Sequence, residues 1–325
     1  MADPLRPPRT GRSARLKHGF LLLCSCSSLL LLPPAPAAVT NAVLHKDSSN
    51  SHNGASDTNV WREISADEMD ARALKSCPAA KNLLAEEPDK WRQGQTPHYV
   101  VHFFASEGDL FARKVATMTD FFYDYISQDL DFAKDRYPVR SHIFTFRNEY
   151  RWKKFLKGQT SVEQWAYSFV SGLCMFLQQA KNTKDSTEVL AHENTHLVIN
   201  HFIHGRLPAW LNEGVAEYYG EFGLSEFRGL KRYSGTAFHG LHDPLPLSRL
   251  FKITDSYPSD TKEVHKLYAT AKYFVGFLMT KKPHKEFPGF LTDMAQDTPV
   301  MDALQKHYGF YDMAALQKEF THFCR

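Results

Sequence analysis

Hydrophobic and polar residues follow two different periodicities along this chain. Between residues 97 and 178, short runs rich in aromatic and β-branched residues, which are typical of strands, alternate with apolar positions at helical spacing. The predicted strands are 98–104, 141–146, 165–170 and 173–178, and the predicted helices between them are 111–125 and 150–156.

After about residue 185 the apolar residues recur only at helical spacing. The predicted helices are 185–199, 207–220, 263–280, 287–295 and 313–323. A strand-rich first part and a helical second part predict an α+β fold, in which a small mixed sheet with helices is followed by a mostly helical half.

The first 37 residues have the pattern of an export signal. A positive region that ends at Lys17 precedes an apolar stretch at 20–32, and Ala35-Pro36-Ala37 offers a small-x-small cleavage site. The apolar stretch is shorter than the roughly 20 residues that a membrane span requires, so a cleaved signal is favoured over an anchor. A lipoprotein anchor at Cys26 is a third, less favoured reading. The prediction is a secreted, periplasmic or cell-envelope protein with no stable membrane span after cleavage.

The rest of the chain divides by composition. Residues 38–60 are small and polar and predict a flexible leader, whereas 61–96 are weakly patterned and predict an N-terminal helical segment. Residues 97–325 predict one domain. The chain of 325 residues is 43% hydrophobic, which is enough for a core.

Charge does not point to a polyanionic partner. The net charge is +3, but residues 1–37 alone carry +4, so the remaining chain is near −1. We therefore predict no nucleic-acid partner. The oligomeric state stays open.

Three of the five cysteines lie beyond the signal, at 77, 174 and 324. An exported protein can carry a disulfide, and a Cys77–Cys324 pair would join the start of the domain to its end. Cys174 lies in an apolar run and is interpreted as a buried thiol rather than a nucleophile.

The sequence His192-Glu193-Asn194-Thr195-His196 carries the clearest chemistry. Histidines four residues apart share one helix face, so both rings can reach one metal ion. Glu193 would point toward the open coordination position, where it can take a proton from a zinc-activated water. The alternative is two incidental histidines, because the chain contains 16.

A third ligand follows on the next predicted helix. Sixteen residues (197–212) separate His196 from Glu213, which is enough for a reversal that returns a carboxylate to the histidines. Two His and one Glu with an open position form a catalytic zinc arrangement, which would hold one Zn²⁺. Glu217, one turn later, could orient a zinc-bound imidazole, or it could be an ordinary solvated glutamate.

Two segments resemble a known family. LAHENTH at 190–196 and WLNEGVA at 210–216 resemble the active-site and third-ligand helices of the gluzincin metallopeptidases, and also the bacterial peptidase-MA-like domains, over roughly residues 97–323. The resemblance implies a zincin-like fold and hydrolysis of peptide or protein substrates, with Glu193 as general base. It also implies a donor to the oxyanion, for which Tyr268 is the candidate and His265 and Tyr233 are reserves.

The same resemblance places a substrate-binding edge strand at 173–178, although an interior core strand has the same pattern. The metzincin pattern does not fit, because it requires Gly at 199 and His at 202, where the chain has Ile199 and Phe202. His201 and His204 are interpreted as helix-end residues. No Gly-x-Met-x-Asn segment is found, so exopeptidase action is unsupported.

Two alternatives to a peptidase remain open from the sequence. One is a zinc amidase or another hydrolase that acts on a non-peptide envelope substrate. The other is a non-enzymatic binding module that retains the fold.

Overall fold

The computed structural model describes residues 61–132, 139–160, 162, 164, 166–179, 183–229, 238, 240–255 and 257–325, and only the backbone at 183–186. The predicted signal (1–37), the leader (38–60) and the reserve residue Tyr233 lie outside these residues. In the described part of the chain, no helix combines the length and the apolar character needed to cross a membrane.

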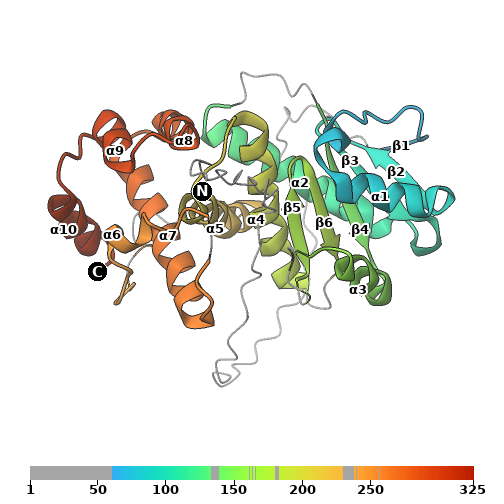
Figure 1. Cartoon of the computed structure of the whole chain (residues 1–325). Helices are drawn as coiled ribbons and strands as arrows, with labels where there is room; N and C mark the ends of the chain where they lie inside the picture. Colours follow the sequence, from blue (N-terminus) through green and yellow to red (C-terminus); the bar gives the residue numbers. More distant parts are fainter. Residues whose placement is uncertain are drawn as a thin grey trace, which may run out of the picture.

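One six-stranded mixed sheet organises the first half of the molecule (Figure 1). Its strands are β1 (Arg62–Ile64), β2 (Trp91–Gln95), β3 (Tyr99–Phe104), β4 (Ser141–Phe146), β5 (Ser168–Ser171) and β6 (Cys174–Gln178). The order across the sheet is β1-β2-β3-β4-β6-β5. The β3–β4 and β4–β6 pairs are parallel, and the other three pairs are antiparallel.

Ten α-helices are described, and seven of them, α4 to α10, follow the last strand. They are α1 (Pro78–Glu86), α2 (Leu110–Asp129), α3 (Glu149–Lys157), α4 (Thr183–Phe202), α5 (Ala209–Phe227), α6 (Leu247–Leu250), α7 (Thr261–Lys281), α8 (Phe287–Ala295), α9 (Val300–Tyr308) and α10 (Met313–Phe323). The predicted α+β class, with a mixed sheet before a helical half, is confirmed.

Alternation along the strands builds two cores, one on each face of the sheet. Ile143 and Met175 belong to the larger core, which continues through α2, α4, α5 and α7 into the C-terminal helices. Phe144 and Phe176, their neighbours in sequence, belong to a smaller aromatic core with residues of α1 and α3. The sheet is therefore covered by helices on both faces, and α4 lies on the face of the larger core.

One prediction about the sheet needs correction, and one open alternative is decided. Residues 61–96 contain the predicted short helices, but they also contribute β1 and β2, so they extend the same sheet. The sequence WRQGQ of β2 lacks an alternating apolar pattern because two of its three buried residues are Gln93 and Gly94, and only Trp91 is a large apolar residue. For residues 173–178 the resemblance implied an edge strand and an interior strand was the open alternative; the interior strand is observed, because β6 lies inside the sheet and β5 forms the edge beside it.

The predicted Cys77–Cys324 disulfide is wrong in this structure. Cys77, Cys174 and Cys324 are free thiols. Cys77 lies in the smaller core and Cys324 in the larger one, and α1 and α10 lie at opposite ends of the molecule (Figure 1). Cys174 is buried, as predicted.

Candidate metal centre

Helix α4, which carries the two histidines, is anchored along its inner face. The Tyr99 hydroxyl on β3 donates a hydrogen bond of 2.7 Å to Asn194 Oδ1. Asn194 Nδ2 donates to the Thr119 carbonyl of α2 at 3.3 Å. One turn and a half later, Asn200 Nδ2 donates to the Gly172 carbonyl in the β5–β6 turn at 2.9 Å. Asn194, inside the His192–His196 motif, thus fixes the rotation of the helix.

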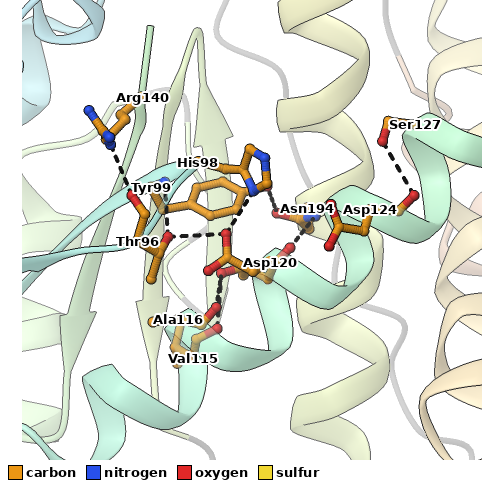
Figure 2. A network of polar contacts seen from close by, with 11 residues as sticks. Thr96, His98, Tyr99, Val115, Ala116, Asp120, Asp124, Ser127, Arg140 and Asn194 are labelled. Atoms are coloured by element: carbon orange, nitrogen blue, oxygen red, sulfur yellow. Dashed lines mark hydrogen bonds and ion pairs between the residues drawn. The ribbon is translucent and has the colours of Figure 1, made fainter. Parts of the chain in front are cut away.

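A buried polar network holds Tyr99 in turn (Figure 2). Asp120 of α2 accepts hydrogen bonds from the Thr96 hydroxyl (3.1 Å) and from His98 Nδ1 (2.9 Å). Thr96 Oγ1 accepts from the Tyr99 backbone N–H at 3.2 Å. Since Asp120 is only 2% exposed, these bonds are sheltered from water. They tie β3 and α2 together directly behind α4.

The return of the chain after α4 brings α5 close to α4. Gly205 turns with a φ of 125°, and a Cβ there would lie 2.2 Å from the Ala295 carbonyl oxygen. A Cβ on Gly220 of α5 would lie 3.4 Å from His192 Cβ. This small residue lets the two helices approach at the histidine, and the approach places the acidic residues of α5 over α4.

Three side chains converge between α4 and α5. His192 Nε2 lies 3.4 Å from Glu213 Oε2, His196 Nε2 lies 3.8 Å from the same oxygen, and the two Nε2 atoms are 3.2 Å apart. All three ligand atoms lie within 4.8 Å of one another. The predicted ligand set is thus brought to one point.

This point fits a metal ion. Glu213 is fully buried, and its Oε2 finds no hydrogen-bond partner among the described residues although it faces two ring nitrogens. An unsatisfied buried carboxylate oxygen is costly unless something positive binds it. Two imidazoles and one carboxylate are a donor set that binds divalent transition metals in proteins. The side chains of His192, His196 and Glu213 are 12%, 4% and 0% exposed, so the opening of the site lies on the His192 side.

The pKa shifts of Glu213 and His196 are consistent with a site that binds a cation. Burial raises the pKa of Glu213, but His196, His192 and the Tyr257 hydroxyl outweigh burial, and the net pKa lies below its ordinary value. Burial lowers the pKa of His196. Both directions favour an ionised carboxylate beside a neutral imidazole, which are the protonation states of metal ligands.

Each of the three ligands has an orienting neighbour. Glu217 Oε1 lies 3.3 Å from His192 Nδ1, the ring nitrogen opposite the cluster. The Asn212 side chain lies beside His196 and acts to raise its pKa against the effect of burial. The Tyr257 hydroxyl donates to Glu213 Oε1 at 2.7 Å. Such partners fix ligand orientation and tautomer.

Glu193 lies next to the cluster and is almost wholly buried. Its Oε1 accepts a hydrogen bond of 2.8 Å from the Ser168 hydroxyl on β5. Its Oε2 has no hydrogen-bond partner among the described residues. One oxygen is therefore fixed by the edge strand while the other keeps its acceptor capacity.

The remaining candidates take different places. Tyr268 of α7 is buried, and its ring stacks on that of Tyr257 with centroids 6.2 Å apart. His201 lies in the last turn of α4, and His204 lies just beyond its end. Neither belongs to the cluster that can hold a metal. Burial, its largest cause, lowers the pKa of His201 to about 4.

Sequence reasoning missed Ser168, Asn212 and Tyr257. Asn212 stands directly before Glu213 in the WLNEG segment, and its position there was a usable signal. Ser168 and Tyr257 belong to a strand and a loop that reach the site only through the tertiary fold, so no local pattern marked them.

Comparison with known proteins adds no assignment. No protein-family model matches the chain, and no curated protein matches its sequence.

Proposed function

We propose that this protein is a zinc-dependent metallopeptidase of the gluzincin type, with a zincin-like arrangement of its active-site helices. The observation that carries the proposal is the convergence of His192, His196 and Glu213 around one unsatisfied carboxylate oxygen, with Glu193 beside them. Three protein ligands leave a coordination position for water or substrate, as in catalytic zinc sites.

Zinc held by His192, His196 and Glu213 would act as a Lewis acid that lowers the pKa of a water and polarises a substrate carbonyl. The chain's own contribution begins with Glu193. Because Ser168 occupies Oε1, Oε2 is the oxygen that accepts the proton of the attacking water. The same oxygen then delivers that proton to the leaving nitrogen of the peptide.

The edge strand supports a peptide as substrate. In the strand order of the described residues, β5 has a neighbour on one side only, β6. An extended peptide can add to such an edge through backbone hydrogen bonds. Ser168 belongs to β5 and contacts Glu193, so a peptide along this strand would lie next to the general base.

Tyr268 remains the proposed donor to the developing oxyanion. Its support is its place against Tyr257, whose hydroxyl contacts the buried ligand Glu213. A donor that acts on the transition state changes turnover more than substrate binding.

The test compares four forms of the purified protein. Wild type, Glu193→Gln, His192→Ala and His201→Ala are analysed for bound metal and then incubated with a diverse peptide mixture, with the products read by mass spectrometry. His201→Ala is the matched control, because it removes a histidine of the same helix that lies outside the cluster. Wild type and His201→Ala should bind one zinc and cleave peptides, and His192→Ala should lose both properties.

Glu193→Gln should retain zinc and lose turnover by about 10²- to 10⁴-fold, the usual contribution of a general base. Bound zinc without cleavage by the wild type would refute peptidase action and favour a non-peptide substrate or a binding role. Stoichiometric zinc in His192→Ala would refute the ligand assignment itself.

A further inference from the structure

Two cysteines meet in the smaller core, away from the candidate metal centre. Cys77 immediately precedes α1 and is its N-cap residue, and Cys174 is the first residue of β6. Both side chains are completely buried. They lie 97 positions apart in sequence, so only the tertiary fold brings them together.

The backbone around them is closely packed. His142 Nε2 donates to the Asp70 carbonyl at 2.7 Å, and His142 is the register partner of Cys174 across β4 and β6. A Cβ placed on Gly172, in the β5–β6 turn, would lie 3.0 Å from Ser76 Oγ. The segment that leads to Cys77 therefore crosses the sheet at the start of β6.

The two thiols lie in the same buried cluster, and each perturbs the pKa of the other. The Cys174 thiol is the largest cause that lowers the pKa of Cys77 to about 7, and the nearby Ser171 hydroxyl acts in the same direction. The neighbouring Cys77 thiol and burial raise the pKa of Cys174. A sulfur with thiolate character beside a second thiol is the arrangement from which a disulfide forms. Cys324 shows only the effect of burial, which raises its pKa to about 12.

We propose that Cys77 and Cys174 form a disulfide when the chain folds in an oxidising compartment, and that Cys324 stays reduced. The Cys77 thiolate attacks one sulfur of a disulfide oxidant, such as oxidised glutathione or a protein disulfide, and one thiolate of the oxidant leaves. Cys174 loses its proton and attacks the Cys77 sulfur of the mixed disulfide, which expels the second thiolate. Two thiols of the chain are oxidised, and one disulfide of the oxidant is reduced to two thiols.

The bond would fasten α1 and the segment before β2 to the interior of the sheet. That segment holds its place through burial of small residues such as Ala80 and through the Asp70 contact. A cross-link between positions 77 and 174 restricts the unfolded chain over a long loop, so it should stabilise the fold. Since both sulfurs are buried, the reaction belongs to folding, and the finished bond should resist reductants.

The experiment is disulfide mapping of the full chain, exported to the periplasm of a bacterial expression host. Free thiols are blocked with N-ethylmaleimide in denaturant, and the chain is cut with trypsin. The three cysteines fall in separate peptides, 76–81, 158–181 and 319–325, and Cys24 and Cys26 share a fourth, 18–46. We expect a cross-link between 76–81 and 158–181 and an N-ethylmaleimide adduct on 319–325. Adducts on all three peptides, or a cross-link that includes Cys324, would overturn the proposal.

A second measurement removes the dependence on any single variant. Urea unfolding midpoints are compared before and after reduction with a phosphine in wild type, Cys324→Ser and Cys77→Ala/Cys174→Ala. Reduction in denaturant followed by refolding should lower the midpoint of wild type and Cys324→Ser alike and leave that of the double variant unchanged. An equal response of the double variant, or none in wild type, would contradict the assignment.

Discussion

The hydroxyl of Tyr257 provides the sharpest test of how the metal centre is built. Tyr257 lies in the loop before α7 and donates a hydrogen bond of 2.7 Å to Glu213 Oε1. Glu213 is fully buried, so water cannot replace that donor when it is removed. Tyr257→Phe keeps the ring and its stacking on Tyr268 and deletes only the hydroxyl.

The size of the effect follows from two independent considerations. A hydrogen bond to a charged group contributes about 1.5–3 kcal/mol. The loss of a residue that orients a metal ligand typically lowers metal affinity about 10- to 100-fold, which is about 1.4–2.7 kcal/mol. The two ranges agree, and we expect Tyr257→Phe to weaken zinc binding about 10- to 100-fold.

The assay is competition for zinc against a chelating dye, at fixed pH and ionic strength. Tyr268→Phe is the matched control, because it removes a hydroxyl from the ring stacked on Tyr257 and leaves the Glu213 hydrogen bond in place. Tyr268→Phe should bind zinc as tightly as wild type and lower turnover, whereas Tyr257→Phe should weaken zinc binding.

Unchanged zinc affinity in Tyr257→Phe would refute the reasoning that buried partners of Glu213 determine the strength of the site. If Tyr268→Phe bound zinc more weakly and Tyr257→Phe bound it with full affinity, Tyr268 rather than Tyr257 would be the residue that supports the metal ligands. An unchanged turnover in Tyr268→Phe would remove Tyr268 from the proposed chemistry.

Three further predictions concern the neighbours of the site and the core. Ser168→Ala should retain zinc but lower turnover about 10- to 100-fold, because the loss of a hydrogen bond to the Glu193 carboxylate, which contributes about 1.5–3 kcal/mol, frees that side chain to rotate; steady-state kinetics measures this, and an unchanged rate would contradict it. Burial lowers the pKa of His142 from 6.5 to about 4, so its stabilising contribution is complete above pH 6.5 and is lost as the pH falls toward 4. Urea unfolding should show about 2 kcal/mol less pH dependence between about pH 8 and about pH 5 in His142→Gln than in wild type, and equal slopes would refute this. Gly214→Ala should destabilise the fold by about 1–3 kcal/mol, because the added Cβ would lie 2.8 Å from the Ala271 carbonyl oxygen; an unchanged thermal midpoint would contradict this close packing.

Local patterns predicted much of the secondary structure. Strand β4 was predicted with its observed bounds, and α8 and α10 agree equally well. These elements succeed because their own residues supply the apolar face that they bury. Strand β2 fails for the opposite reason. Its sequence WRQGQ forms a strand because it pairs with β3 along all five residues, and Trp61 packs over Gly94, where a Cβ would lie 2.2 Å from the Trp61 ring.

The ligand candidates of the metal centre were also readable in the sequence. His192 and His196 share a helix face because the helix has 3.6 residues per turn, and that fact needs no tertiary information. The prediction of Glu213 as the third ligand required one assumption, that the chain reverses between the two helices. The Gly205 turn and the close approach at Gly220 provide that reversal.

Only the tertiary structure decided which groups hold these residues in place. Ser168 reaches Glu193 across 25 positions, Tyr257 reaches Glu213 across 44, and Tyr99 reaches Asn194 across 95. The same is true of Cys77, which meets Cys174 rather than Cys324. Periodicity in a sequence records how a residue faces its own helix or strand. It carries no information about which distant element lies opposite, since that depends on how the sheet and helices pack as a whole.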